Sequence, residues 1–587
     1  MAKEIKQKKS WSISPPRNLS ALLSKYTGMI VVLVLLTIIA NGLSISVPKM
    51  VAQSIDTYAS GSFTLSYLVI EFSVVAVFIF FFTYLQNIAQ VYISERVARD
   101  IRSTLIEKIS MQSYAYVENV TPEKLLTHLT SDVDAVKVFV STAVSSLISS
   151  AFLIIAVSTL LLLTDLRLAL VVLSIMPIIG LAFFVVLRKV RKLFLKAQEA
   201  IDWLNRVIGE SIVGASLMRI LDAKKEEKQK FVHANTEARD ISFGILKLFS
   251  SLIPVITLLT YFATLAIVVL GGYFVIEGDM SLGNFTAFNS YLAILIFPIL
   301  ILGFISNLIT RAQVSYRRIL KVLEAPLERR SGTLQAELRG DVEVKNVSLK
   351  FGEKWALKNV SLSVSAGSKI AIIGPSAAGK TQLLYLLSGL LLPTEGSVQF
   401  DGKNISQYEA ESFRHQVGFV FQESFMFNLS LRENIALSDE VGESTLQRAI
   451  DTAELTTYIA TLPEKLETSV SERGTSLSGG QKQRIMLARA LALDPKVLLL
   501  DDFTARVDIN TERKILKNIA GMYPKLTLIS VTQRISSIEH YDQIILLMQG
   551  EVVARGTHEE LIHSSPEYIQ IYESQKSMRQ YEEENAI

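Results

Sequence analysis

Cysteine is absent from this sequence of 587 residues, which excludes disulfide bonds, thiolate metal sites and cysteine nucleophiles. A strong net charge is lacking as well, since 59 Lys and Arg stand against 56 Asp and Glu, for a formal charge of +3. Nucleic-acid binding usually requires a clear basic excess, so the composition gives no reason to expect nucleic acid as a partner. A chain of this length is too long for one hydrophobic core and should contain several domains.

Long apolar runs are the most prominent feature that is present. Half of the residues are hydrophobic and the mean hydropathy is +0.35, although charged residues still make up 20% of the chain. The apolar excess lies in the first half, in runs near or above the roughly 20 residues that cross a hydrocarbon core. We therefore predict an integral, multi-pass membrane domain in contact with lipid. The six predicted spans are residues 27–47, 68–88, 140–163, 168–187, 248–276 and 285–308.

Basic residues predict the orientation of these spans. The segments Glu95 to Lys137 and Arg188 to Lys247 are rich in Lys and Arg, whereas the alternate loops carry few of them. By the positive-inside rule, both termini and these two segments are expected in the cytosol. The first apolar run is longer than the core of a signal peptide and no clear cleavage site follows, so we predict that it is retained. The expected location is a bacterial plasma membrane.

The character of the sequence changes near residue 325. Ala325-Pro326 ends the last apolar helix, a polar linker follows, and the alternation typical of strands begins at Asp341. The basic segments between spans keep helical spacing, so we predict helices that continue beyond the membrane. The expected fold is an all-α six-helix transmembrane domain joined to a cytosolic α/β domain of the P-loop NTPase type. The predicted boundaries are 1–325 for the transmembrane domain, 326–340 for the linker, 341–575 for the nucleotide-binding domain and 576–587 for a charged tail.

A phosphate-binding loop follows an apolar strand of the second half. The strand Lys369 to Ile373 leads into G-P-S-A-A-G-K-T and then into an apolar helix. Glycine lets such a loop point its N–H groups at a phosphate, and the N-terminus of the next helix favours negative charge. Lys380 is predicted to reach the β- and γ-phosphates, and Thr381 to bind Mg²⁺ through its hydroxyl group. The loop residues are Gly374, Pro375, Ser376, Ala377, Ala378, Gly379, Lys380 and Thr381.

Later motifs narrow the prediction to one family. Leu477-Ser478-Gly479-Gly480-Gln481 begins a helical pattern, and the apolar strand Val497 to Leu500 ends at Asp501. Together with the phosphate loop, these motifs resemble the ATP-binding cassette (ABC) transporters over residues 342 to about 573. The six spans before them are similar to the exporter-type half-transporters of this family, which fuse one transmembrane domain to one nucleotide-binding domain.

The resemblance implies roles for further residues. Asp501 would hold Mg²⁺, Gln422 would touch both Mg²⁺ and the attacking water, and Phe351 would stack on the adenine of ATP. In this family two cassettes enclose two ATP molecules, and the signature of one cassette contacts the nucleotide held by the other. The signature residues here are Ser478, Gly479, Gly480 and Gln481.

Two positions and one four-residue segment depart from the family pattern. Hydrolytic members have Glu as general base at the position of Asp502 and His at the position of Gln533, and the segment Ala505-Arg506-Val507-Asp508 commonly reads Ser-Ala-Leu-Asp. Reference pKa values of Asp and Glu are about 3.9 and 4.3, so their basicity hardly differs. Asp is one methylene shorter, however, and a displacement on the order of 1 Å can cost about 100-fold in rate. An amide at residue 533 can bind a γ-phosphate but cannot become cationic.

These departures resemble one half of heterodimeric multidrug-type exporters. The resemblance implies that the chain contributes Lys380, Asp501 and Asp502 to a degenerate ATP site and its intact signature to a competent site. The competent site would belong to a homologous partner that carries Glu and His at the altered positions. The implied activity is ATP-driven export of a drug-like molecule, a lipid or a peptide. A homodimer with two slow sites and an ATP-gated regulator or channel stay open as alternatives, and import is less favoured because no extra docking domain is evident.

Overall fold

The computed structural model describes residues 16–327, 332–438, 441–471 and 474–585. The basic stretch before residue 16, residues 328–331 of the predicted linker and residues 586–587 of the predicted tail therefore lie outside the described residues. The chain divides into two units, of which the first is Met1–Met111 with Val120–Pro326 and the second is Gln112–Asn119 with Leu327–Ile587.

The first unit is built from helices, which confirms the predicted membrane fold. Within the described residues, six helical segments are long and apolar enough to cross a membrane: Thr27–Ala59, Leu65–Ser110, Pro122–Thr164, Leu166–Val213, Lys224–Ile276 and Leu282–Leu302. The helices of this unit are α1 (Leu19–Ser24), α2 (Thr27–Ala59), α3 (Leu65–Ser110), α5 (Pro122–Thr127), α6 (Val133–Val138), α7 (Ser145–Thr164), α8 (Leu166–Val213), α9 (Ala215–Ile220), α10 (Lys224–Ala266), α11 (Gly272–Ile276) and α12 (Leu282–Glu324).

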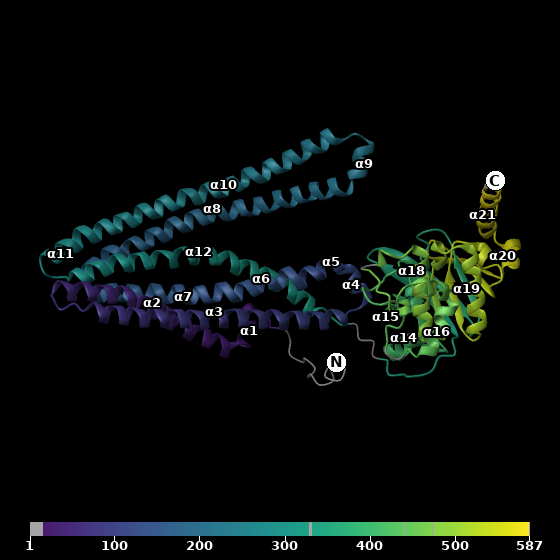
Figure 1. The fold of residues 1–587 in the computed structure, drawn as a ribbon. Coiled ribbons are helices and arrows are strands. Elements are labelled where there is room, and N and C mark those ends of the chain that lie inside the picture. The colour runs from purple at the N-terminus through teal and green to yellow at the C-terminus, as the bar shows by residue number, and fades with distance from the viewer. Residues whose placement is uncertain (1–15, 328–331, 439–440, 472–473, 586–587) are drawn as a thin grey trace. The chain divides into compact units, whose positions relative to one another are not determined.

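Several of these helices are much longer than a membrane is thick. Helix α3 has 46 residues, α8 has 48, and α10 and α12 have 43 each. At about 1.5 Å per residue each of them extends over roughly 65 Å or more, about twice the thickness of a hydrocarbon core. Helices α8 and α10 run side by side and are joined at one end by the short helix α9 (Figure 1). The long basic segments of the sequence are thus continuations of membrane helices.

The spans contain local departures from regular α-helix. Proline lies inside four of the helices, at Pro48, Pro177, Pro254 and Pro298. Each proline removes one backbone hydrogen bond and favours a bend. The third and fifth spans also contain π-helical turns, which are uncommon and often mark functional sites. These turns are His128–Asp132, Phe139–Val144 and Ile267–Gly271.

A carboxylate joins the first and last spans. Asp56 of α2 accepts hydrogen bonds from Ser281 Oγ at 2.7 Å and from Gly283 N at 2.7 Å. Both donors stand at the beginning of α12, where a negative charge is favoured by the unpaired N–H groups of a helix N-terminus. Because the two helices pack directly against one another here, Asp56 fixes the end of α12 relative to α2.

An ion pair with a buried carboxylate and a half-exposed arginine joins the third span to the continuation of the last. Asp132 is 1% exposed and accepts from Arg318 Nε at 2.9 Å and from Arg318 Nη2. Its second oxygen also lies 2.7 Å from His128 Nδ1. An exposed pair, Arg102 and Asp134, lies 2.7 Å apart in the same region, with 57% of the Asp134 side chain accessible. The two pairs offer a comparison of buried and exposed charge within one helix bundle.

We expect Asp132→Asn to lower the free energy of unfolding of the protein by about 1.5 to 3 kcal/mol, because the buried side chain at residue 132 would lose charge-assisted hydrogen bonds to Arg318, which is itself 48% exposed. The matched control is Asp134→Asn, which removes an exposed pair and should cost less than about 1 kcal/mol. Thermal unfolding of both variants in the same detergent measures the difference. Equal melting temperatures for the two variants would contradict the stabilising role of the pair formed by Asp132 and Arg318.

The second unit contains two β-sheets. One is antiparallel, in the order β2-β1-β4-β5, and the other is largely parallel, in the order β10-β9-β3-β8-β7-β6. The strands are β1 (Val342–Phe351), β2 (Lys354–Val364), β3 (Lys369–Ile373), β4 (Glu395–Phe400), β5 (Lys403–Asn404), β6 (Val417–Val420), β7 (Val497–Asp501), β8 (Thr527–Val531), β9 (Gln543–Met548) and β10 (Glu551–Gly556).

Helices cover the parallel sheet, which confirms the predicted α/β class (Figure 1). Strands β7 and β8 are buried along their whole length, as expected for central strands that are covered on both faces. The helices are α13 (Lys380–Leu387), α14 (Ala410–Gln416), α15 (Leu431–Ile435), α16 (Glu443–Thr452), α17 (Thr456–Thr461), α18 (Gly479–Ala492), α19 (Ile509–Met522), α20 (His558–Ser564) and α21 (Pro566–Asn585). Helix α4 (Tyr114–Val120) begins within this unit, where the ring of Tyr114 lies 5.3 Å from that of Tyr385.

Candidate functional site

The parallel sheet brings the predicted phosphate loop and the predicted catalytic positions to one edge. Strands β3, β8 and β7 are neighbours and run in the same direction, so their carboxyl ends lie together. The phosphate loop follows β3, residue 501 ends β7 and residue 502 follows it, and residue 533 follows β8. In open α/β sheets, ligands bind at this edge.

The phosphate loop is shaped by close backbone contacts. Gly374 has φ of 149°, and a Cβ atom at this position would lie 2.0 Å from the carbonyl oxygen of Leu547. Only glycine fits such a position, because any side chain would collide with backbone. The chain then reaches α13, and the amides of Gly379, Lys380 and Thr381 have no acceptor among the described residues. Free amides at a helix N-terminus are donors suited to phosphate oxygens.

Lys380 stands within this loop. Its Nζ donates to the carbonyl oxygens of Gly374 and Pro375, at 2.8 Å each, and the residue is 9% exposed. Burial lowers the pKa of Lys380, while the nearby carboxylates of Asp502 and Asp501 act in the opposite direction. The ammonium group therefore lies between the loop and the two carboxylates, where a phosphate oxygen could bind to it.

Asp501 has the properties of a Mg²⁺ ligand. Its Oδ1 accepts from Thr381 Oγ1 at 3.2 Å, and its buried Oδ2 has no hydrogen-bond partner within the described part of the chain. Mg²⁺ prefers carboxylate and hydroxyl oxygens together with phosphate oxygens. Burial and the charge of Asp502 raise the pKa of Asp501, as expected for a carboxylate that lacks full compensation. An unpaired carboxylate oxygen beside a hydroxyl group thus fits the predicted role.

The raised pKa predicts how stability depends on pH. A carboxyl group whose pKa is higher in the folded protein lowers the stability as pH rises through that pKa. At pH 7, Asp501→Asn should therefore raise the stability of the nucleotide-free protein by about 1 kcal/mol, since a neutral amide costs less to bury than a charge. The gain should shrink as pH falls, and stabilisation by Mg²⁺ with ATP should be lost. Thermal unfolding at several pH values checks this.

A suitable control for this experiment is Asp508→Asn. Asp508 is the exposed N-cap of α19 and accepts from Thr511 N at 2.9 Å, and these backbone hydrogen bonds lower the pKa of its carboxyl group. Asn caps a helix about as well as Asp, so little change is expected. An Asp501→Asn protein that is less stable than the wild type at pH 7 would show that the ionised carboxylate is fully compensated.

Asp502 occupies an unusual backbone conformation. Its φ of 46° lies in the left-handed region, and its N–H donates to the carbonyl oxygen of Val531 at 3.0 Å. Asp adopts this region more readily than most residues. Burial raises the pKa of Asp502, whereas the positive charges of Lys380 and Arg534 oppose the shift. The carboxylate is therefore close to the phosphate loop, and its role as a shortened general base stays a prediction.

Gln533, predicted at the position of the family's switch histidine, and Gln422 each follow a strand of the parallel sheet, β8 and β6 respectively. Gln533 is exposed, and its carbonyl oxygen accepts from Gln575 Nε2 at 2.6 Å. Gln422 is exposed as well, just beyond the end of β6, and its carbonyl oxygen accepts from the buried Gln483 at 2.9 Å. In both residues the backbone carbonyl oxygen accepts a hydrogen bond and the residue is exposed to solvent. This arrangement suits a side chain that contacts a ligand.

The signature forms the N-terminus of helix α18. Ser478 Oγ accepts from Gln481 N at 3.2 Å, and Gln481 Oε1 accepts from Ser478 N at 2.8 Å, which makes a capping box. The amides of Gly479 and Gly480 have no acceptor among the residues that the structure describes. No hydrogen bond or ion pair of the described residues joins this turn to the phosphate loop. Signature and phosphate loop are thus two separate sets of donors.

The segment Ala505–Asp508 lies directly over the signature glycines. A Cβ atom on Gly480 would stand 2.8 Å from the carbonyl oxygen of Arg506, and one on Gly479 would stand 3.2 Å from Arg506 Cδ. Packing within the chain therefore requires glycine at residue 480, where the obstacle is backbone, whereas the exposed side chain of Arg506 could move away from a Cβ at residue 479. Arg506 is exposed, and its guanidinium has no hydrogen-bond or ion-pair partner within the described ranges.

Phe351, the predicted adenine contact, is 43% exposed at the end of β1. The neighbouring strand carries a second exposed aromatic residue, Trp355, which pairs with Lys350 in the register of β1 and β2. The ammonium group of Lys350 lies 5.4 Å from the centre of the Trp355 ring. Sequence analysis did not single out Trp355, although an aromatic residue four positions after Phe351 was a signal that could have been used.

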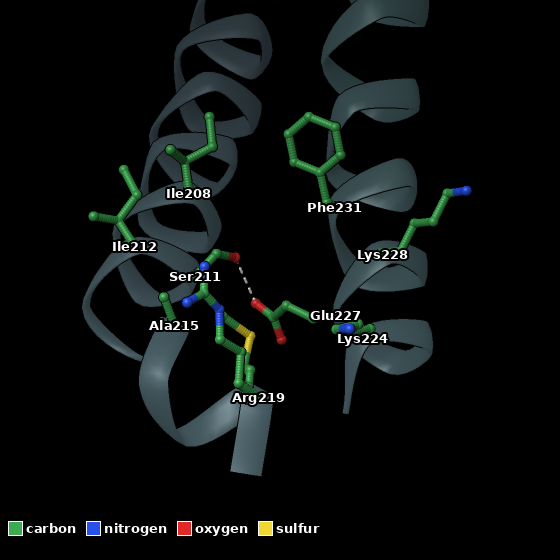
Figure 2. Close-up of a pocket in the computed structure, with 10 residues that line it drawn as sticks. Ile208, Ser211, Ile212, Ala215, Arg219, Lys224, Glu227, Lys228 and Phe231 are labelled. Carbon is green, nitrogen blue, oxygen red and sulfur yellow. Dashed lines mark hydrogen bonds between the residues drawn. The ribbon is translucent and has the colours of Figure 1, made fainter. Parts of the chain in front are cut away.

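The tip of the α8–α10 hairpin contains a separate hollow of about 440 Å³ (Figure 2). Ile208, Ile212 and Phe231 give it apolar walls, and Ser211 Oγ donates to Glu227 Oε1 at 2.8 Å between the two helices. The hollow lacks a loop of free amides, so its chemistry differs from that of the phosphate loop. The hydrogen bond between Ser211 and Glu227 joins α8 to α10 close to the turn through α9.

Comparison with known proteins places both units in known families. Residues 29–299 match the family described as ABC transporter transmembrane region, and residues 357–505 match the family described as ABC transporter. The ABC transporter ATP-binding protein YfiB of Bacillus subtilis (strain 168) is 34% identical, over 82% of this chain and 85% of that protein. An ATP-dependent lipid A-core flippase of Syntrophus aciditrophicus (strain SB) is 28% identical, over 84% and 83% respectively.

A solved structure shares the fold. The structure of a bacterial Atm1-family ABC exporter with ATP bound superposes with a TM-score of 0.78 and 22% sequence identity, covering 94% of this chain and 99% of that one. At this identity the likeness concerns the fold, a helical transmembrane domain followed by an ATPase domain.

Proposed function

The chain belongs to the ABC transporter family, as an exporter-type half-transporter, and from this premise we propose that it is one subunit of a heterodimeric exporter. It is a multi-pass membrane protein that binds ATP with Mg²⁺ and couples ATP hydrolysis to transport. We propose that the two nucleotide-binding elements of this chain belong to two different ATP sites. The phosphate loop of this chain serves a degenerate site, and its signature completes the competent site of a homologous partner with Glu and His at the altered positions.

The contrast between two sets of residues carries this proposal. At the carboxyl edge of the sheet, Asp502 and Gln533 replace the longer base and the titratable switch of hydrolytic relatives. At α18, by comparison, the capping box of Ser478 and Gln481 and the two free glycine amides are complete. A chain with altered catalytic positions and an intact signature suits a dimer whose two ATP sites differ.

The residues of the degenerate site can bind nucleotide without fast turnover. Lys380 and the free amides of α13 would hold the phosphates, and Asp501 with Thr381 would hold Mg²⁺, which neutralises phosphate charge when bound. Phosphoryl transfer depends chiefly on positioning and charge stabilisation, so a base that is too short slows the reaction without preventing binding. The site would then contribute to closing the two cassettes.

The arrangement in the membrane follows from the basic residues. Lys and Arg are dense in the extensions at residues 95–137 and 188–247, so we propose that these extensions and both termini are cytosolic, in a bacterial plasma membrane. Helices that continue from the spans could transmit cassette closure to the membrane domain. The transported molecule would be drug-like, a lipid or a peptide, since the spans offer apolar and aromatic side chains and few charges.

Transport by inside-out vesicles that contain the assembled pair tests this function. We expect ATP-dependent accumulation of an apolar fluorescent probe inside the vesicles against its gradient, with no accumulation in a Lys380→Ala variant paired with a partner altered in the same way. A channel would only equilibrate the probe. ATP-gated equilibration without accumulation would therefore replace the exporter by an ATP-gated channel.

A further inference from the structure

The C-terminal helix α21 forms hydrogen bonds with the backbone of the switch segment, defined here as Thr532–Ile535. Gln575 of α21 donates from Nε2 to the carbonyl oxygen of Gln533 at 2.6 Å, and its Oε1 accepts from Ile535 N at 3.0 Å. A side-chain amide has one donor group and one acceptor, so a single residue satisfies both backbone groups that flank Arg534. No sequence motif had singled out Gln575.

The switch segment is also tied to neighbouring elements through Arg534. Arg534 Nη1 donates to the carbonyl oxygen of Val507 at 3.4 Å and to Glu512 Oε2 at 3.2 Å. Arg534 N donates to Thr532 Oγ1 at 3.1 Å. The segment is therefore held both by α19 and the Ala505–Asp508 segment, through Arg534, and by α21, through Gln575. The side chain of Gln533 has no partner of its own among the described residues, so its placement depends on its backbone.

The part of α21 that carries Gln575 is anchored in the core. Tyr568 is fully buried, and its hydroxyl group lies 2.7 Å from His558 Nδ1. Gln575 follows seven residues later, which is about two turns along the helix and brings it to the same face. Ile571 and Tyr572 pack against the core between these two positions. Gln575 thus lies on a part of α21 that is packed against the core.

We propose that Gln575 is a positioning residue for the switch: it holds the backbone of Gln533 so that the Gln533 amide faces the γ-phosphate of ATP bound at this chain's own phosphate loop. The inference rests on the proposed function, which assigns nucleotide to that loop. ADP has no γ-phosphate, so Gln575 should affect the affinity for ATP and leave the affinity for ADP unchanged. The C-terminal helix would then set the discrimination between the two nucleotides.

Nucleotide affinities of the full-length chain in nanodiscs test this inference. Gln575→Ala should weaken binding of ATP with Mg²⁺ by about 3- to 10-fold, the value of one or two hydrogen bonds, with ADP affinity unchanged. Gln575→Met, which keeps a side chain of similar length and packing, should behave in the same way. The neighbouring exposed residues give matched controls, Ser574→Ala and Lys576→Ala, for which both affinities should match the wild type.

A double-mutant cycle separates positioning from a general effect on folding. If Gln575 acts through Gln533, the ratio of ATP to ADP affinity in Gln533→Ala should not fall further when Gln575→Ala is added. Equal weakening of ATP and ADP, or a full additional loss of the ratio in the double variant, would overturn the inference. Lys380→Ala tests the premise independently: ATP binding that survives this substitution would contradict the proposed function, whichever result Gln575→Ala gives.

Discussion

Ser478→Arg is expected to lower ATP turnover of the assembled pair by about 100-fold or more, whereas Asp502→Ala should leave turnover close to that of the wild type. Ser478 begins α18 and accepts from Gln481 N, and an arginine can neither cap the helix in this way nor leave room for a phosphate. In the proposed assignment Asp502 belongs to the degenerate site, which would contribute little turnover. Steady-state release of phosphate by the purified pair measures both effects.

Loss of a helix cap has to be distinguished from loss of a nucleotide contact. Thr557 and Glu560 form an equivalent capping box at the start of α20, away from the signature. Thr557→Arg should therefore cost about 1 kcal/mol of stability, as Ser478→Arg does, without the loss of turnover. A pair in which Asp502→Ala is the more damaging change would reverse the assignment of the two ATP sites.

Restoring both altered positions should produce the largest gain. Asp502→Glu combined with Gln533→His is expected to raise ATP turnover at this chain's own site by about 100-fold, because the base regains its missing methylene and the switch becomes titratable. Each single substitution should give less than the double variant. The measurement is ATP turnover of the assembled pair in which the general-base Glu of the partner is replaced by Gln, so that turnover reports the site built on this chain's phosphate loop. A double variant as slow as the wild type would show that the site is limited by another feature.

Lys380→Ala within the double variant serves as the control for that gain. Removing the ammonium that stands within the phosphate loop should abolish the added turnover, because the phosphates would lose their main positive contact. Turnover that persists in this triple variant would come from a contaminating ATPase.

The elements that the sequence predicted well are those determined by residues close together in the chain. Six apolar runs of sufficient length predicted six spans, since a hydrocarbon core dictates length and composition. The strand, glycine loop and helix around Lys380 predicted the P-loop NTPase class, because each part is determined by neighbouring residues. The roles of Asp502 and Gln533 stay predictions, since they depend on a bound nucleotide and a partner.

The elements that sequence could not predict depend on contacts between distant residues. Asp132 and Arg318 are 186 positions apart, and their pairing depends on how two long helices are aligned. The signature glycines had been explained by phosphate alone, yet the carbonyl oxygen of Arg506 would also collide with a side chain at residue 480. Gln575 lies beyond every recognised motif, and only the packing of α21 brings it to the switch.

The most direct measurement is ATP turnover by the full-length chain, first alone and then with a homologous subunit that carries Glu and His at the altered positions. Slow turnover by the isolated chain, and a large increase on assembly that disappears with Ser478→Arg, is the result we expect. Rapid turnover by two identical copies, dependent on Asp502, would contradict the division of the two ATP sites between different subunits.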